Sequence, residues 1–180
     1  LQNQADFVLS LVREPDQKRL LFLHYDYHNL KILVKASTEP ERFTPLLFPF
    51  GTLCIPRLKK QIAEKKTFGV ATLAEKTAVE AANVWAETGD AQKVDFLLDQ
   101  AYFAELQALS RKIDCPFFLR YAQEMTDFTN LLSFFRARFQ RQPKSFLAQV
   151  FLPGGTIRVE DLLSSKVSTP VTEDGSNALS

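Results

Sequence analysis

The chain has 180 residues, of which 46% are hydrophobic and 24% are charged, and its 22 basic and 21 acidic side chains leave a net charge of +1. This composition supports a packed core and lacks the basic surplus of a nucleic-acid-binding protein. No apolar run reaches the ~18 residues that a membrane-spanning helix needs. The two cysteines, Cys54 and Cys115, have no metal or disulfide spacing, so we expect a reducing, cytosolic environment.

The first half of the chain is expected to form helices separated by prolines. Pro15 predicts the end of a short helix over 4–13, because the residue before a proline avoids the α conformation. Apolar residues at every third or fourth position predict a helix over 16–36. Three prolines predict a loop over 37–51, and a short helix over 56–66 is expected to begin with a proline in its first turn.

The second half carries helix-capping signals. Thr72 and Glu75 have the spacing of a capping box, which predicts a helix that ends before Gly89. Asp90 is expected to cap the next helix, and Pro116 to begin the one after it. The expected helices are 72–88, 90–113, 116–142, 144–151 and 159–163. No stretch alternates over enough residues to form a sheet, so we predict an all-α fold of antiparallel helical bundles.

An aromatic-rich stripe runs along the helix that begins at Pro116. Its members recur at every third or fourth position, which is the spacing of one helix face. We expect this stripe to be the buried face of the helix. The stripe consists of Phe118, Tyr121, Met125, Phe128, Leu132, Phe135 and Phe139.

A five-residue motif occurs twice, about 100 residues apart. Residues 26–30 read DYHNL, and residues 127–131 read DFTNL. A second pair of matching blocks, 48–53 and 152–157, follows at a similar offset. Two blocks that agree in order indicate an internal duplication with a unit of about 100 residues.

The duplication predicts two helical units and a tail. The first unit is expected over 1–89 and is N-terminally incomplete, because it lacks the long helix that precedes the motif of the second. The second unit is expected over 90–163 and is C-terminally incomplete, because the first continues further past its own turn. Residues 164–180 lack apolar periodicity and are predicted to be a linker or a disordered tail. We therefore interpret the chain as an excerpt of a longer repeat protein.

The motif places an aspartate and an asparagine three residues apart inside otherwise apolar helices. The pairs are Asp26 with Asn29 and Asp127 with Asn130. Such residues can serve as ligands or as acid–base groups. Alternatively, each pair is buried and hydrogen-bonded, and it fixes how its helix meets a neighbour. We favour this second interpretation because both copies carry the pair without an accompanying nucleophile or base. Lys35 and Arg136 are candidates for the compensating charges.

Two histidines raise the question of a metal site. His24 and His28 lie four residues apart on one helix, a spacing that can hold zinc. Asp26 does not share their face, and the second copy has Met125 and Thr129 in their places. We therefore predict no metal site and favour two polar residues on a partly exposed face. A metal-dependent helical enzyme that uses these three side chains is the alternative function.

Two further features have a structural and a functional interpretation. The turn from Pro153 to Gly155 resembles a phosphate loop but lacks the Gly-Lys-Ser/Thr ending, so we interpret both residues as structural positions. The helix over 116–142 ends in a basic cluster. Such a cluster stabilises a helix C-terminus and is also a candidate docking patch for an acidic partner surface. The cluster consists of Arg136, Arg138, Arg141 and Lys144.

Three blocks of the chain resemble the C-type subunits of V/A-type rotary ATPases, the homologues of the eukaryotic d-type subunits. The blocks are 95–106, 127–138 and 151–157, and the resemblance extends to about residue 163. It implies a funnel of three similar helical units around a pseudo-threefold axis. It also implies a non-catalytic protein without a cofactor, in which the aspartates and asparagines of the motif are structural positions.

The resemblance further implies a place on the cytoplasmic face of a membrane, bound to the central stalk and the membrane rotor ring. There the protein would couple ATP synthesis or hydrolysis to the transport of protons or sodium ions. A generic helical-repeat scaffold is a further alternative for the function.

Overall fold

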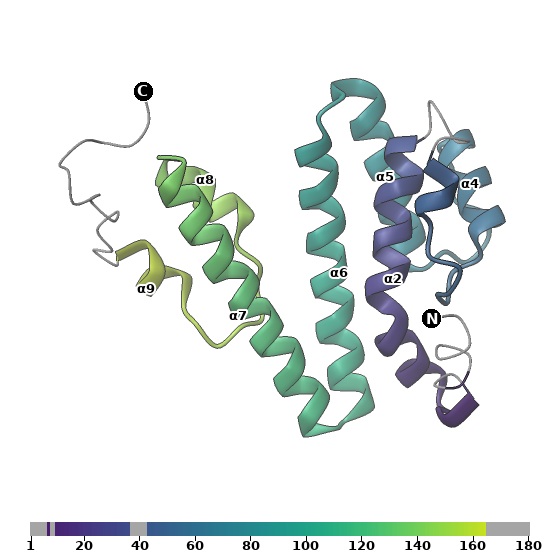
Figure 1. Cartoon of the computed structure of the whole chain (residues 1–180), viewed down its shortest axis with the longest axis horizontal. Coiled ribbons are helices and arrows are strands. Elements are labelled where there is room, and N and C mark those ends of the chain that lie inside the picture. Colours follow the sequence, from purple (N-terminus) through teal and green to yellow (C-terminus); the bar gives the residue numbers. More distant parts are fainter. Residues whose placement is uncertain (1–6, 8–9, 37–42, 165–180) are drawn as a thin grey trace. The chain divides into compact units, whose positions relative to one another are not determined.

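The computed structural model describes residues 7, 10–36 and 43–164 (Figure 1). These residues form helices, turns and bends but no strand, which confirms the prediction of an all-α fold. The helix expected over 4–13 lies largely outside the described residues, and so does the predicted tail beyond Ser164. None of the described helices combines the length and the hydropathy that crossing a membrane requires.

The described helices follow the order that the sequence predicts. Their bounds are α2 (Pro15–Lys35), η2 (Thr44–Leu46), α4 (Ile55–Glu64), α5 (Leu73–Thr88), α6 (Ala91–Ile113), α7 (Pro116–Phe139), α8 (Lys144–Val150) and α9 (Val159–Ser164). The helix α7 ends at Phe139, a few residues earlier than predicted. Arg141 takes a left-handed conformation with φ of 55°, and the amide of Gln142 donates to the carbonyl of Ala137 at 2.8 Å. This cap closes the helix before Pro143 is reached.

The caps of α5 and α6 explain where these helices begin. The hydroxyl of Thr72 accepts from the amide of Glu75, and the Glu75 carboxylate accepts from the amide of Thr72. The carboxylate of Asp90 accepts from the amides of Gln92 and Lys93. Both caps satisfy amides that an α-helix leaves without a partner, and both confirm the predicted start of their helix.

Replacing Gly89 with alanine is expected to lower the free energy of unfolding by about 1 kcal/mol. Gly89 ends α5 with φ of 61°, and an added Cβ would meet no atom within 4 Å, so backbone strain alone carries the cost. Urea denaturation followed by circular dichroism measures the loss. Gly89→Asn is the control, because asparagine tolerates the left-handed region and should cost less. An alanine variant as stable as the parent would contradict this cap.

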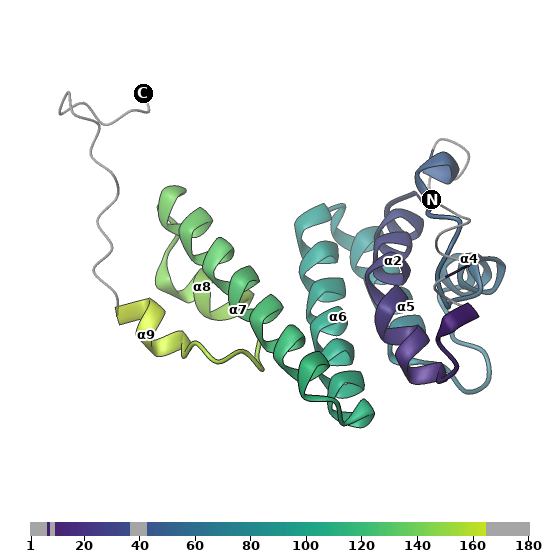
Figure 2. The same cartoon turned by 60° about the horizontal axis from the view of Figure 1, so that its bottom comes forward.

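The described helices belong to two compact units, Leu1–Arg120 and Tyr121–Ser180. In the first unit, α2 packs against α5 and α6, and α4 packs against α5. Two views show α2, α5 and α6 side by side (Figure 1, Figure 2). Alanines on α5 let its neighbours approach closely. Fully buried core residues of this unit are Leu23, Leu30, Val34, Ala74, Ala78, Ala81, Val94 and Leu98.

The first compact unit includes α6, which the sequence interpretation assigned to the second repeat unit. The division into repeats at residue 89 stays a prediction. The second compact unit is built from α7, α8 and α9 around one small apolar core. This core contains Phe134, Ala137, Leu147 and Phe151, with Phe146, Val159 and Leu162 packed against it.

The prediction of the buried face of α7 is wrong. Most of the predicted stripe is exposed, namely Tyr121, Phe128, Leu132, Phe135 and Phe139. The buried residues lie on the other side of the helix and are Ala122, Thr126, Asp127, Asn130, Phe134 and Ala137. Both sides of α7 offer apolar surface, so the polar groups decide between them. Asp127 and Asn130 find hydrogen-bond partners only on the side that is buried, and leaving them unsatisfied would cost free energy.

Candidate functional site

The aspartate of the first motif anchors the loop that follows α2. Asp26 is buried, and its Oδ1 accepts hydrogen bonds from the backbone amides of Thr52 and Leu53 at 2.8 and 3.1 Å. Its Oδ2 accepts from the hydroxyl of Thr52. A carboxylate only accepts, so three donors from one loop suit it well. The Asp26 side chain therefore fixes residues 52–53 to the middle of α2.

The asparagine one turn later holds the same loop at a second point. The Nδ2 of Asn29 donates to the carbonyl of Phe48 at 3.1 Å, and the amide of Phe48 donates to the Oδ1 of Asn29 at 2.9 Å. This pair of bonds satisfies both polar backbone atoms of one loop residue. An ionised aspartate could not donate here, which explains why the position carries an amide side chain.

The second motif makes the same contacts. Asp127 accepts from the amides of Thr156 and Ile157, both at 2.9 Å, and from the hydroxyl of Thr156. Asn130 exchanges two hydrogen bonds with the backbone of Leu152, at 2.9 and 2.8 Å. The two loops are therefore attached to α2 and α7 through the same kinds of donor and acceptor.

A glycine lies against each aspartate. A Cβ added to Gly51 would lie 2.5 Å from the Oδ1 of Asp26, and one added to Gly155 would overlap with the Oδ1 of Asp127. Glycine thus lets the loop backbone come close enough for the next two amides to reach the carboxylate. The structure places Pro153 at an exposed position in the turn before Gly155.

Sequence reasoning did not single out the loop partners of the motif. These partners are Thr52 and Phe48 in the first unit, and Thr156 and Leu152 in the second. Their signal was present, because each occupies the same place in the repeated blocks 48–53 and 152–157. A threonine directly after the glycine supplies an amide and a hydroxyl to one carboxylate, which is a reason for that residue type.

The two aspartates differ in their electrostatics. Burial raises the pKa of Asp26, and it outweighs the hydrogen bonds from Thr52 and Leu53 and the nearby Arg19, which act in the opposite direction. Burial also acts to raise the pKa of Asp127, whose surroundings are more open. There the hydrogen bonds from Thr156 and Ile157 prevail, and they leave the pKa of Asp127 below its usual value.

The stabilising contribution of Asp127 is expected to disappear in acid. Because the folded pKa of Asp127 lies below the unfolded value of about 3.9, the contribution is present above that value and is lost as the pH falls through the folded pKa. Urea denaturation of the parent and of Asp127→Asn at about pH 7 and about pH 3 measures this. The difference between the two midpoints should shrink at the lower pH.

Asp26→Asn is the matched control for this pH dependence. The pKa of Asp26 is raised by folding, so its ionisation costs stability as the pH rises from the unfolded pKa through the folded pKa. The difference between parent and variant should therefore change with pH in the opposite direction. Equal trends for the two variants would contradict the assignment.

A polar network joins α2 to α6 in the first unit. The guanidinium of Arg19 contacts the carboxylates of Glu105 and Asp26, and the hydroxyl of Tyr27 donates to Glu105 at 3.0 Å. Burial and the charge of Glu105 raise the pKa of Tyr27 well above its ordinary value, so the phenol keeps its proton and acts as the donor. The network connects the loop anchor to the neighbouring helix.

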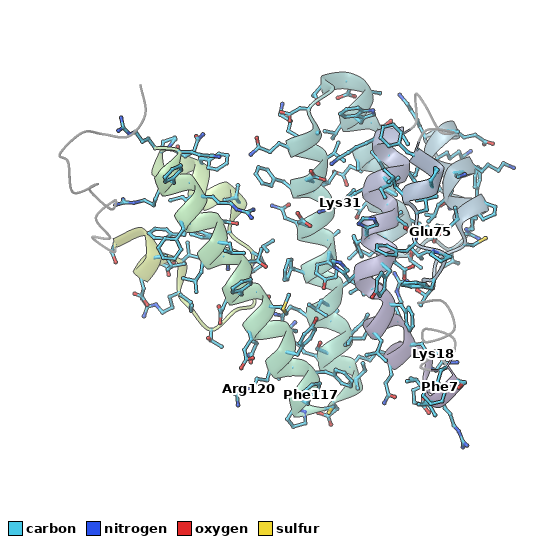
Figure 3. The ribbon with its side chains drawn as sticks, viewed as in Figure 1. Phe7, Lys18, Lys31, Glu75, Phe117 and Arg120 are labelled. Atoms are coloured by element: carbon cyan, nitrogen blue, oxygen red, sulfur yellow. The ribbon has the colours of Figure 1, made fainter. Side chains whose placement is uncertain are left out.

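Two lysines of α2 form ion pairs with α6. Lys31, labelled in Figure 3, pairs with Asp99 at 2.7 Å, and Lys35 pairs with Asp95 at 2.7 Å. The expectation that Lys35 compensates the charge of Asp26 is therefore wrong. Lys35 lies more than two helical turns beyond Asp26 and reaches α6 instead, while an arginine one to two turns before Asp26 supplies the nearby cation.

The two histidines lie apart from the aspartate of their motif. The Nε2 of His28 is 3.4 Å from the carbonyl of Leu46, and the ring of His24 lies edge-on to Tyr102. Asp26 is held by the loop instead. Within residues 7, 10–36 and 43–164, no group of three His, Cys, Asp or Glu side chains is arranged to hold a metal ion. The alternative of a metal-dependent enzyme gains no support from this arrangement.

The basic cluster at the end of α7 contains side chains in different surroundings. Arg136 and Arg141 are exposed. Arg138 is partly buried, and its guanidinium carbon lies 5.9 Å from the centre of the Phe134 ring, a cation–π contact. The side chain of Lys144 lies outside the described part of the structure. A docking role for these four residues stays a prediction.

The fold and the site define an all-helical protein in which buried aspartate and asparagine side chains attach loops to helices. The family model of the ATP synthase (C/AC39) subunit matches residues 1–178, and the chain belongs to this family. The match confirms the family that the three sequence blocks indicated.

Two curated relatives give the same picture. The chain is 24% identical over 151 residues to the C-type subunit of the V-type sodium ATPase of Enterococcus hirae, a match that covers 84% of this chain and 46% of that protein. It is 26% identical over 150 residues to the C-type subunit of the A-type ATP synthase of Thermococcus onnurineus, which covers 81% and 41%. The chain thus spans less than half the length of these relatives. No solved structure gives a significant match.

Proposed function

We propose that the chain is part of a non-catalytic protein that couples the central stalk of a V/A-type rotary ATPase to its membrane rotor ring. Through this coupling, ATP synthesis or hydrolysis would drive or use the transport of protons or sodium ions. The family match over residues 1–178 carries the proposal. The two relatives support it, because each is named as a part of such an ATPase or ATP synthase. The proposed location is the cytoplasmic face of the membrane, peripheral to the bilayer.

The motif side chains support a mechanical role. Asp26 and Asp127 each accept three hydrogen bonds from their loops, and Asn29 and Asn130 each exchange two. Groups that are saturated in this way stabilise the folded chain and leave little capacity for binding or proton transfer. The polar network and the ion pairs between α2 and α6 also link those helices. A part that transmits torque needs such internal stiffness.

The matching loop anchors also support the duplication. We infer that the helices of the two motifs belong to copies of one helical unit. In the complete protein, such units would surround a pseudo-threefold axis and form a funnel, as the family resemblance implies. A structure of the full-length protein tests this inference, because residues 16–58 should superpose on residues 117–162.

Recovery of the intact ATPase tests the coupling role. The complete protein carries an affinity tag in its own cells, and complexes are purified from detergent-solubilised membranes. Mass spectrometry is expected to find proteins of the central stalk and the rotor ring in constant proportion to the tagged protein. Their absence from a preparation that still contains the tagged protein would overturn the proposal. Stoichiometric zinc or iron in the pure protein would favour the metal-dependent enzyme instead.

A further inference from the structure

Five large apolar side chains form an exposed stripe along α7, the α7 stripe. Its members are Tyr121, Phe128, Leu132, Phe135 and Phe139. Phe128 and Phe139 are 58% and 68% exposed. The spacing of three, four or seven residues puts all five on one side of the helix. That side lies away from the buried face with Asp127 and Asn130, so the α7 stripe is not part of the core of the second unit.

The first unit shows what covers the matching side of α2. The two motifs align Tyr27 with Phe128 and Val34 with Phe135. Tyr27 is only 3% exposed and Val34 is fully buried. The helix α6 lies over this side of α2, where the rings of Tyr27 and Tyr102 are 5.6 Å apart. A helix therefore covers in the first unit the side that is open in the second.

A charged residue borders both surfaces at the same position. The motif aligns Lys35 of α2 with Arg136 of α7. Lys35 donates to both carboxylate oxygens of Asp95, at 2.7 and 2.8 Å. Arg136 is exposed and pairs with no carboxylate among the described residues. A helix that covered the α7 stripe as α6 covers α2 would need an acidic residue opposite Arg136.

The surfaces differ at one position. Lys31 of α2 pairs with Asp99 at 2.7 Å, but the motif aligns Lys31 with Leu132. A carboxylate opposite Leu132 would lose water without gaining a partner, which is unfavourable. The covering helix therefore needs an apolar residue there. This excludes the α6 helix of a second copy as a good fit, since that helix carries Asp99 at the place in question.

We propose that the α7 stripe binds an amphipathic helix of a partner chain with one defined pattern. In this partner helix an acidic residue is followed by apolar residues four and seven positions later, as Asp95 is followed by positions 99 and 102 in α6. The acidic residue pairs with Arg136, and the two apolar residues pack on Leu132 and Phe128. The inference rests on the matching surfaces of α2 and α7 and does not depend on the coupling role.

Two synthetic peptides test the pattern. The first has the sequence of residues 91–113 with Asp99→Leu, and the second is the unchanged sequence. Fluorescence anisotropy with the intact chain is expected to show that the unchanged peptide binds at least about tenfold more weakly, because it brings an unpaired carboxylate against Leu132. Absence of binding by the first peptide, or equal binding by both, would overturn the proposal.

A charge exchange tests the pairing with Arg136. Arg136→Glu should weaken the binding of the first peptide about tenfold, and a further Asp95→Lys change in the peptide should restore it for that variant. Arg158→Glu, directly before α9, is the control and should bind like the parent. Circular dichroism checks that each variant is folded. Binding that is indifferent to Arg136→Glu would overturn the proposal, as would dimerisation of the chain that Phe128→Ser abolishes.

Discussion

Replacing Asp127 with alanine is expected to lower the free energy of unfolding by about 3 kcal/mol or more. The change removes three hydrogen bonds and leaves the amides of Thr156 and Ile157 without their acceptor. Each buried donor without a partner costs about 1–3 kcal/mol, which exceeds the net value of an ordinary hydrogen bond. Urea denaturation followed by circular dichroism measures the loss.

Asp95→Ala is the matched control for the loss of a helix carboxylate. The Asp95 side chain is 36% exposed and pairs with Lys35 at the surface of the unit. Exposed ion pairs of this kind contribute about 0–1 kcal/mol. The structure therefore predicts a large effect at one aspartate and a small effect at the other. A loss at Asp127 no larger than that at Asp95 would show that the loop does not depend on its anchor.

Replacing Gly155 with alanine is expected to cost about 1–3 kcal/mol, the range for overpacking. The new methyl group would overlap with the Oδ1 of Asp127 and would also approach the Asp127 amide nitrogen, at 3.5 Å. Either the carboxylate or the loop must then move, and the hydrogen bonds to Thr156 and Ile157 lengthen. Comparison with Gly89→Ala, where nothing lies near the new methyl group, separates this clash from backbone strain.

A double-mutant cycle identifies the atom that meets the methyl group. Once Asp127 is alanine, the methyl group of Gly155→Ala no longer meets a carboxylate. The second change should then cost much less than it does in the parent, with a coupling energy of about 0.5–3 kcal/mol. Simple additivity of the two losses would contradict the close packing of Gly155 on Asp127.

Local signals made much of the fold predictable. The caps at Thr72 and Asp90 involve residues two or three positions apart, so their chemistry can be read directly from the chain. The all-α class follows from helix-period patterns, which also depend on near neighbours. The repeated motif was equally visible, because it is a property of the sequence itself.

Contacts between distant residues were less predictable. Apolar periodicity located the helix α7, but it could not decide between two apolar sides. The decision rests on Asp127 and Asn130, whose partners lie 22 to 30 residues away in a loop. Likewise, Lys35 pairs with Asp95, which is 60 residues distant, and a helical pattern holds no information about that choice.

The spacing of the loop anchors sets where the chain tolerates a change in length. The asparagine and its loop partner are 19 residues apart in the first unit and 22 in the second, yet both form the same pair of hydrogen bonds. The aspartate contacts, 26 and 29 residues apart, show the same difference of three residues. Insertions between the anchors should therefore leave the attachment of the loop intact. An insertion of one residue between Phe48 and Thr52 should instead break it, because both anchors depend on that fixed interval.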